Sequence, residues 1–142
     1  MMINAAQQAG PSADTILVVD DNRMVTRALS TLIRDAGYHA VACHNGADAM
    51  RAAEAEGAST PAAAVVDIHL PDINGLVLSQ KLRDRFGPHT PIVVVSGDTS
   101  METIKSLPHV GATYFFPKPV NATLLMARLK ELIENGASRE SA

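Results

Sequence analysis

The sequence predicts an α/β fold in which a five-stranded parallel sheet is doubly wound, with five helices on its two faces. Five short apolar runs alternate along the chain with five stretches in which apolar residues recur at helical spacing. The apolar runs are continuous, which is typical of strands that are covered on both faces. Because strand–helix–strand units cross over in the right-handed sense, repeated units of this kind build a parallel sheet between two layers of helices.

The strands are predicted at the apolar runs 15–19, 39–43, 62–67, 91–95 and 112–116. The third run, Ala62 to Val66, consists of five small or β-branched residues and is followed directly by Asp67. Such a run indicates a strand in the middle of a parallel sheet.

Helices are predicted between and after these strands, at about 23–36, 46–56, 74–86, 101–107 and 121–135. Three of them carry their apolar residues at helical spacing, namely Val25, Leu29, Leu32 and Ile33, then Val77, Leu78 and Leu82, and last Leu125, Leu129, Leu132 and Ile133. Glycine or proline marks most of the helix ends, at Gly37, Gly87 and Pro108, and Asn121 is a predicted N-cap.

A single domain is predicted at 15–135, between an N-terminal tail at 1–14 and a C-terminal tail at 136–142. A chain of 142 residues is long enough for one domain with its own core but short for two domains. The first fourteen residues show no sustained period, so we expect a flexible tail there. Gly136 is expected to end the last helix.

Composition and charge argue against several classes of function. The net charge of −3 and the aromatic fraction of 4% disfavour nucleic acid as a direct partner. No run approaches the roughly 18 apolar residues of a membrane span, and the start of the chain lacks the pattern of a secretion signal, so a cytoplasmic protein is expected. The single cysteine, Cys43, excludes an internal disulfide and a cysteine-based metal cluster.

Polar side chains stand where four of the predicted strands end. Asp20 and Asp21 follow the first strand, Asp67 ends the third, Ser96 follows the fourth, and Lys118 lies just past the fifth. The carboxyl ends of parallel strands meet at one edge of the sheet, where open α/β folds bind their ligands. Carboxylates that converge there repel each other unless a cation or a proton intervenes, and Mg²⁺ suits carboxylate and phosphate oxygens. The set therefore indicates Mg²⁺-dependent phosphoryl chemistry.

Four stretches of the chain, in this order and at strand ends, resemble the receiver domain of two-component response regulators, in its chemotaxis-regulator-like form. They are 16–22, 65–75, 94–97 and 111–119. The resemblance covers about residues 14 to 135 and implies the flavodoxin-like strand order 2-1-3-4-5. It also implies a signalling switch that is controlled by phosphorylation.

The resemblance implies a phosphoacceptor and a set of metal ligands. Asp67 would accept the phosphoryl group from a histidine kinase or a histidine phosphotransfer protein. Mg²⁺ would be held by Asp20, Asp21, Asp67 and the backbone carbonyl of His69.

The resemblance also implies how a phosphoryl group would be recognised and signalled. Ser96 and Lys118 would contact the phosphoryl oxygens, and Ser96 and Phe115 would be the switch residues. Their movement would change the face formed by the fourth helix, fifth strand and fifth helix, which an unknown downstream protein reads. Lys118-Pro119 resembles the cis peptide of the family. The expected assembly is a monomer or a phosphorylation-dependent dimer.

The residues fit two other functions less well than this switch. A phosphorylation-independent pseudo-receiver, which serves only as an interaction domain, is disfavoured by the complete set of acidic residues, Ser96 and Lys118. An aspartate-nucleophile phosphatase needs a second acid two positions after the nucleophile, where this chain has His69. We therefore expect no enzyme beyond autodephosphorylation. His69 is either an exposed loop residue or one that tunes the phosphoryl lifetime. The chain is either a stand-alone receiver or part of a larger protein.

Overall fold

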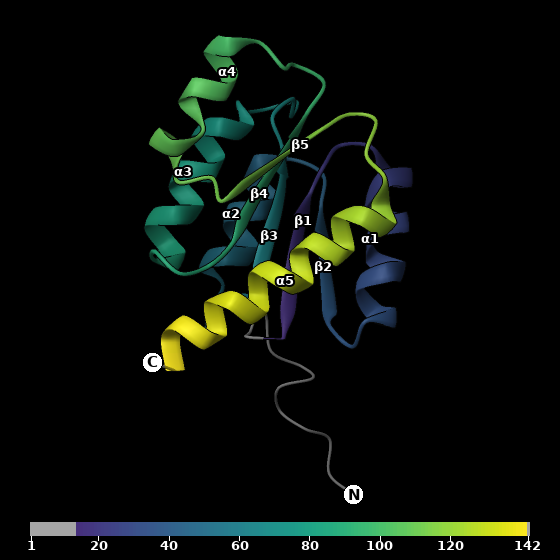
Figure 1. Ribbon diagram of the computed structural model, residues 1–142, viewed down its shortest axis with the longest axis vertical. Coiled ribbons are helices and arrows are strands. Elements are labelled where there is room, and N and C mark those ends of the chain that lie inside the picture. Colours follow the sequence, from purple (N-terminus) through teal and green to yellow (C-terminus); the bar gives the residue numbers. More distant parts are fainter. Residues whose placement is uncertain (1–13, 142) are drawn as a thin grey trace, which may run out of the picture.

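The computed structural model describes residues 14–141, with side chains up to Asn135, as a parallel sheet between two layers of helices (Figure 1). The strands are β1 (Thr15–Val19), β2 (His39–Cys43), β3 (Ala63–Asp67), β4 (Ile92–Ser96) and β5 (Tyr114–Pro117). All neighbouring strands are parallel, and their order is β2-β1-β3-β4-β5. The structure thus confirms the predicted fold class and strand order.

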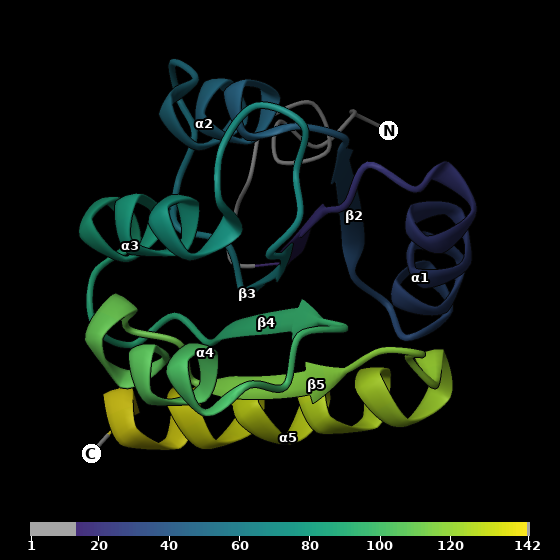
Figure 2. The same ribbon diagram turned by 90° about the horizontal axis from the view of Figure 1, so that it is seen from above.

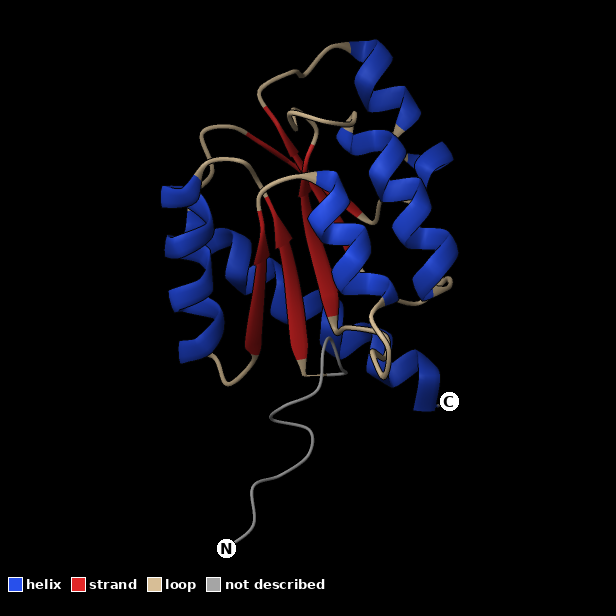
Figure 3. Ribbon diagram, turned by 180° about the vertical axis from the view of Figure 1, so that it is seen from behind, coloured by secondary structure: helices blue, strands red, loops and turns tan. Residues whose placement is uncertain are grey.

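The helices connect the strands and cover both faces of the sheet. They are α1 (Arg23–Asp35), α2 (Gly46–Glu54), α3 (Gly75–Phe86), α4 (Met101–Ser106) and α5 (Ala122–Ser141), with a 3₁₀ helix η2 (Pro108–Val110) after α4. Figure 2 shows the layers from above, with α1 and α5 on one side of the sheet and α2 and α3 on the other, and Figure 3 shows the strands in red between them. No helix among residues 14–141 combines the length and apolar composition that crossing a membrane requires.

The continuous apolar runs are explained by two separate cores. Successive side chains of a strand point to opposite faces of the sheet. On β1, Ile16 and Val18 therefore pack with Leu29 in the core beneath α1 and α5. Leu17 and Val19 belong to the second core, beneath α2 and α3. Every residue of β1, β3 and β4 is buried, so the carboxyl ends of these strands hold their polar residues in fixed positions.

One expectation from the sequence was wrong. Helix α5 does not end near Gly136 but continues to Ser141, because one glycine raises the cost of a helix by only about 1 kcal/mol. Of the apolar residues that indicated α3, Leu78 and Leu82 are buried and Val77 is 48% exposed. All other boundaries agree within two residues. The predicted N-terminal tail lies, apart from Asp14, outside the described residues.

The segment between β4 and β5 is the least regular part of the domain. Pro108 follows α4 and begins η2, a position where its missing N–H costs no helical hydrogen bond. Only Thr103 is buried within α4. The loop before β5 is tied to α3 by the guanidinium of Arg83, which donates to the Gly111 carbonyl at 2.7 Å.

Candidate functional site

The central strands bring two carboxylates together at the carboxyl edge of the sheet. Val19 of β1 lies opposite Val66 of β3, so the next residues along each strand, Asp20 and Asp67, stand side by side. Both side chains are buried, with residue exposures of 4% and 2%. The fold therefore places two acidic groups next to each other where water can solvate them only partly.

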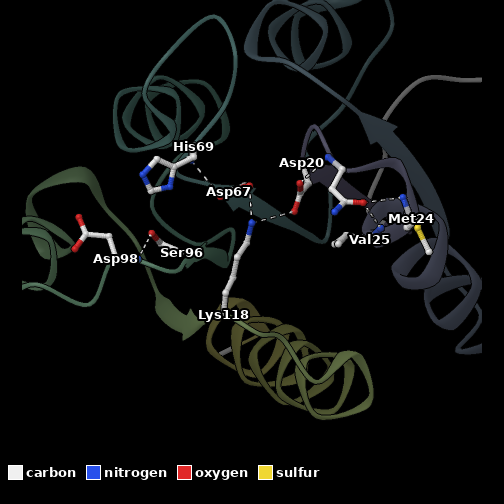
Figure 4. A network of polar contacts seen from close by, with 9 residues as sticks. Asp20, Met24, Val25, Asp67, His69, Ser96, Asp98 and Lys118 are labelled. Atoms are coloured by element: carbon white, nitrogen blue, oxygen red, sulfur yellow. Dashed lines mark hydrogen bonds and ion pairs between the residues drawn. The ribbon is translucent and has the colours of Figure 1, made fainter.

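Lys118 makes the closest ionic contact with this pair. Lys118 follows β5, which is two strands away from β3. Its backbone N–H donates to the Ser96 carbonyl at 2.9 Å. From there the side chain reaches over the end of β4, and Nζ lies 2.9 Å from Asp67 Oδ2 and 4.0 Å from Asp20 Oδ2 (Figure 4). One ammonium group thus faces two carboxylates.

The carboxylates form a group that can hold a metal ion. Ligand oxygens of Asp20, Asp21 and Asp67 all lie within 4.8 Å of one another, and Asp21 is exposed. Burial, which is only partly offset by the hydrogen bond from the Asn22 N–H, raises the pKa of Asp20, and the charge of Asp67 raises it further. A divalent cation would relieve this repulsion, and the all-oxygen donor set is the kind that Mg²⁺ prefers. The residues present therefore fit the predicted metal.

Electrostatics keeps Lys118 charged. Burial alone would lower the pKa of its ammonium group, but the hydrogen bond and charge of Asp67, together with the charges of Asp20 and Asp21, outweigh burial and raise that pKa. The cation is therefore present at every physiological pH and available to a second anion near Asp67.

Ser96 lies beside this group without contacting its carboxylates. It is the last residue of β4 and is fully buried. Its Oγ accepts a hydrogen bond from the Asp98 N–H at 2.9 Å, and Figure 4 shows it on the far side of Asp67 from Asp20. The structure thus brings the predicted hydroxyl to the correct strand end, with its oxygen engaged by the loop that leads to α4.

The loop between β3 and α3 supplies the remaining wall of the site. The His69 N–H donates to Asp67 Oδ1 at 3.1 Å, and the loop closes through an isolated bridge between His69 and Asn74. Gly75 is required there, because a Cβ atom would clash with the Asp67 carbonyl oxygen. The His69 ring points away from Lys118 (Figure 4). Hydrogen bonds from the Ser100 N–H and the Thr103 hydroxyl lower the pKa of Asp98. His69 and Asp98 line a cavity of about 520 Å³ next to α4.

Phe115 lies on the side of β5 that faces α4. It is half-buried and lines a shallow pocket together with Ile104 and Leu107. Its neighbours Tyr114 and Phe116 contact each other edge to face at 5.3 Å, and Tyr114 also lines this pocket. The structure does not bring Phe115 into the acidic group, but places it at the junction of β5 with the short helix.

Sequence reasoning did not identify the partners of Asp72. The helix that follows it in sequence, α3, is capped by Asn74, which accepts from the Leu76 N–H. The carboxylate of Asp72 instead accepts from the N–H groups of Gly46 and Ala47, at 2.8 and 2.9 Å, and so caps α2. These partners are 26 and 25 residues away in sequence, so no local pattern could have identified them.

Comparison with known proteins gives matches over nearly the whole described chain. The family model for the response regulator receiver domain matches residues 16–130. The sensory/regulatory protein RpfC of Xanthomonas campestris pv. campestris is 38% identical over 120 residues, which make up 82% of this chain. The same alignment covers 16% of RpfC, so the chain spans only a small part of that relative's length.

Solved structures show the same architecture. A CheY-like response regulator receiver domain protein from Methanospirillum hungatei superposes with a TM-score of 0.81, at 25% identity, covering 90% of this chain and 99% of that one. A response regulator protein from Burkholderia pseudomallei, solved with a phosphorylated aspartic acid, a calcium ion and citrate, superposes with a TM-score of 0.73. It is 28% identical, and the match covers 89% of this chain and 72% of that one.

Proposed function

This chain belongs to the response regulator receiver domain family, and from that premise we propose that Asp67 accepts a phosphoryl group from a phosphohistidine on a histidine kinase or histidine phosphotransfer protein. The observation that carries the proposal is the position of Asp67. Its buried carboxylate lies at a strand end, forms a salt bridge with Lys118 and is flanked by Asp20. The phosphorylated aspartic acid of the Burkholderia relative supports the same chemistry.

The transfer joins an Asp67 oxygen to phosphorus while the bond between phosphorus and the imidazole nitrogen breaks, and the electron pair of that bond returns to the donor's imidazole. Lys118, already 2.9 Å from Asp67, would accompany the incoming phosphoryl oxygens and offset their charge. Mg²⁺ bound by Asp20, Asp21, Asp67 and the His69 carbonyl would supply the further positive charge that lets the anionic group approach a carboxylate. Positioning and charge neutralisation are most of what such a transfer requires.

An apolar groove provides a place for the phosphate donor to approach. It has a volume of about 360 Å³ and lies between the starts of α1 and α5, with Met24, Val25, Pro119 and Lys118 among its lining residues. Met24 is 80% exposed. A partner that covers these side chains would bring its phosphohistidine to the Lys118 edge of the site, and we place this exchange in the cytoplasm.

Phosphorylation is proposed to act through Ser96 and Phe115. A hydroxyl that turns to the phosphoryl oxygens must leave the Asp98 N–H, which releases the loop before α4. Phe115 borders the same short helix, so its ring can follow that movement. The face formed by α4, β5 and α5 would then change for a downstream protein or a second copy of the chain. The phosphorylated Asp67 is expected to lose its phosphoryl group by autodephosphorylation, and we propose no further catalytic activity.

Beryllium fluoride, a mimic of the phosphoryl group, tests the proposal in the presence of Mg²⁺. We expect amide NMR signals around Ser96 and Phe115 to shift on its addition and to be unaffected in Asp67→Ala. Unchanged binding in Asp67→Ala would exclude the assigned acceptor. A wild-type protein that binds neither Mg²⁺ nor the mimic would instead be a phosphorylation-independent pseudo-receiver.

A further inference from the structure

One side of α1 carries a row of polar residues at the spacing of a single helical face. Arg23, Arg27, Ser30 and Arg34 follow one another at intervals of four, three and four, which aligns them along the helix. They line a groove of about 260 Å³ between α1 and β2, next to the exposed residue Ala42. Figure 2 shows α1 beside β2 at one edge of the sheet.

The arginines of this row differ from the others in the described part of the chain. Arg51, Arg83, Arg85 and Arg128 each donate a hydrogen bond within the molecule. Within the described residues, none of the three arginines of the row has an ion pair or a side-chain hydrogen bond. The acidic neighbours Asp21 and Asp35, at the two ends of the helix, form no ion pair with the row either. The exposed guanidinium groups are therefore free to bind an external anion.

The length of the row indicates an extended ligand. Arg34 lies eleven positions after Arg23, which corresponds to about 16 Å along the helix axis. A single phosphate would contact only one end of such a row. An extended peptide of about five residues spans the same length, and its alternate side chains lie about 7 Å apart, close to the roughly 6 Å between Arg23 and Arg27. Guanidinium groups bind carboxylates in a bidentate manner.

The other wall of the groove can pair with an extended backbone. Within the described sheet, β2 is an edge strand that pairs only with β1. The His39 N–H and the Cys43 carbonyl bond toward the β1 side. Since the backbone groups of successive residues point to opposite sides, those of Ala40 and Ala42 point to the free edge. Free edges of this kind accept an added strand.

We propose that the groove between α1 and β2 binds an extended acidic segment of a partner protein, which adds to the β2 edge and directs its carboxylates to Arg23, Arg27 and Arg34. Nucleic acid is the less suitable occupant, because it has no peptide groups to pair with the free edge of β2 and no Phe, Tyr or Trp lines the groove for base stacking. The interaction does not depend on phosphorylation of Asp67, so it is a second recognition surface.

Amide NMR titration of the whole chain tests this surface with a defined probe. The probe is a blocked hexapeptide in which aspartate alternates with valine, and the control peptide has asparagine in place of aspartate. We expect saturable shifts confined to α1 and to Ala40 and Ala42, and weakening by salt. The double substitution Arg27→Gln with Arg34→Gln should weaken binding about tenfold, and Arg51→Gln, which lies on α2, should not change it.

Several results would overturn the proposal. They are equal affinity for the asparagine peptide, shifts located elsewhere, an unchanged affinity in the double variant, no saturation at millimolar peptide, or tighter binding of a short oligothymidylate. The same titration on Asp67→Ala separates the two proposals, because the acidic peptide should bind this variant as it binds the wild type. Failure of the phosphomimic to bind the wild type would therefore refute only the acceptor site. Failure of the peptide to bind would refute only the groove.

Discussion

At the residue scale, the site is a set of charged groups that alter one another's behaviour. Asp20 is buried beside Asp67, and the shared cation, Lys118, lies 1.1 Å closer to Asp67 than to Asp20 at the distances of 2.9 and 4.0 Å. Lys118 therefore neutralises Asp20 less than it neutralises Asp67. Burial, together with the charge of Asp67, raises the pKa of Asp20. An additional cation has most to offer at this residue.

Asp20→Asn tests the electrostatic part of this account. At pH 7 without Mg²⁺ we expect the free energy of unfolding to rise by about 1 kcal/mol, because the substitution removes a buried charge and its repulsion with Asp67, whose carboxylate oxygen lies within 4.8 Å. Because burial raises the pKa of Asp20 in the folded state, its contribution to stability is complete below the ordinary value of 3.8 and is lost as the pH rises through the folded pKa. The gain from the substitution should therefore vanish below pH 3.8.

Urea unfolding across pH, with and without Mg²⁺, measures these effects. Mg²⁺ should stabilise the wild type and leave Asp20→Asn nearly unaffected. The exposed carboxylate of Asp84 on α3 provides the matched control, since Asp84→Asn should keep the wild-type response to both Mg²⁺ and pH. An identical pH profile for Asp20→Asn and the wild type would refute the raised pKa.

At the element scale, the loop between β3 and α3 is held by contacts on three sides. The Gly75 N–H donates to the Ile68 carbonyl at 2.7 Å, the His69 N–H binds Asp67, and Asp72 caps α2. The loop therefore connects the acceptor strand to two helices, and small changes in its backbone move the carboxylate of Asp67 and the carbonyl of His69 together.

Gly75→Ala tests the close packing of this loop. A Cβ atom there would clash with the Asp67 carbonyl oxygen and the Ile68 backbone, so we expect a loss of about 2 kcal/mol or more in stability. Thermal and urea unfolding measure it. Gly97→Ala is the matched control, because the added atom meets nothing within 4 Å, and it should change stability by under about 1 kcal/mol. Equal stability of the two variants would show that the loop can move away at little cost.

The elements also show what the sequence alone could predict. Continuous apolar runs identify β1, β3 and β4 because both faces of these strands are covered, and the position of Asp20 and Asp67 follows from those runs. The partners of Asp72 could not be predicted, since a contact across 26 residues leaves no local pattern. The exposure of Val77 could not be predicted either, since an apolar residue at helical spacing does not report which side of the helix faces the core.

The chemistry of Ser96 required the structure for a different reason. Its position after an apolar run indicated the right strand end, but its bond to the Asp98 N–H depends on the path of the following loop. The row of arginines on α1 was visible in the sequence as three charges at helical spacing. Only the absence of internal partners among the described residues distinguishes these charges from an ordinary solvated face.

At the scale of the whole molecule, two cores hold a rigid sheet whose carboxyl edge carries the site, while the segment from α4 to β5 is less firmly packed. The site touches this segment through Ser96 and Asp98, and Phe115 lies within it. A charge added at Asp67 is thus next to the part of the fold that can respond to it. The central claim is that Asp67 receives that charge.

Chemical trapping of the modified residue tests this claim most directly. The chain is incubated with Mg²⁺ and the small phosphate donor acetyl phosphate, reduced with borohydride, and digested for peptide mass spectrometry, since reduction converts an aspartyl phosphate to homoserine. We expect homoserine at position 67 alone, none without Mg²⁺, and none in Asp67→Asn, while Asp84→Asn is modified as the wild type is. Modification at Asp20 or Asp21, or wild-type labelling of Asp67→Asn, would contradict the assignment.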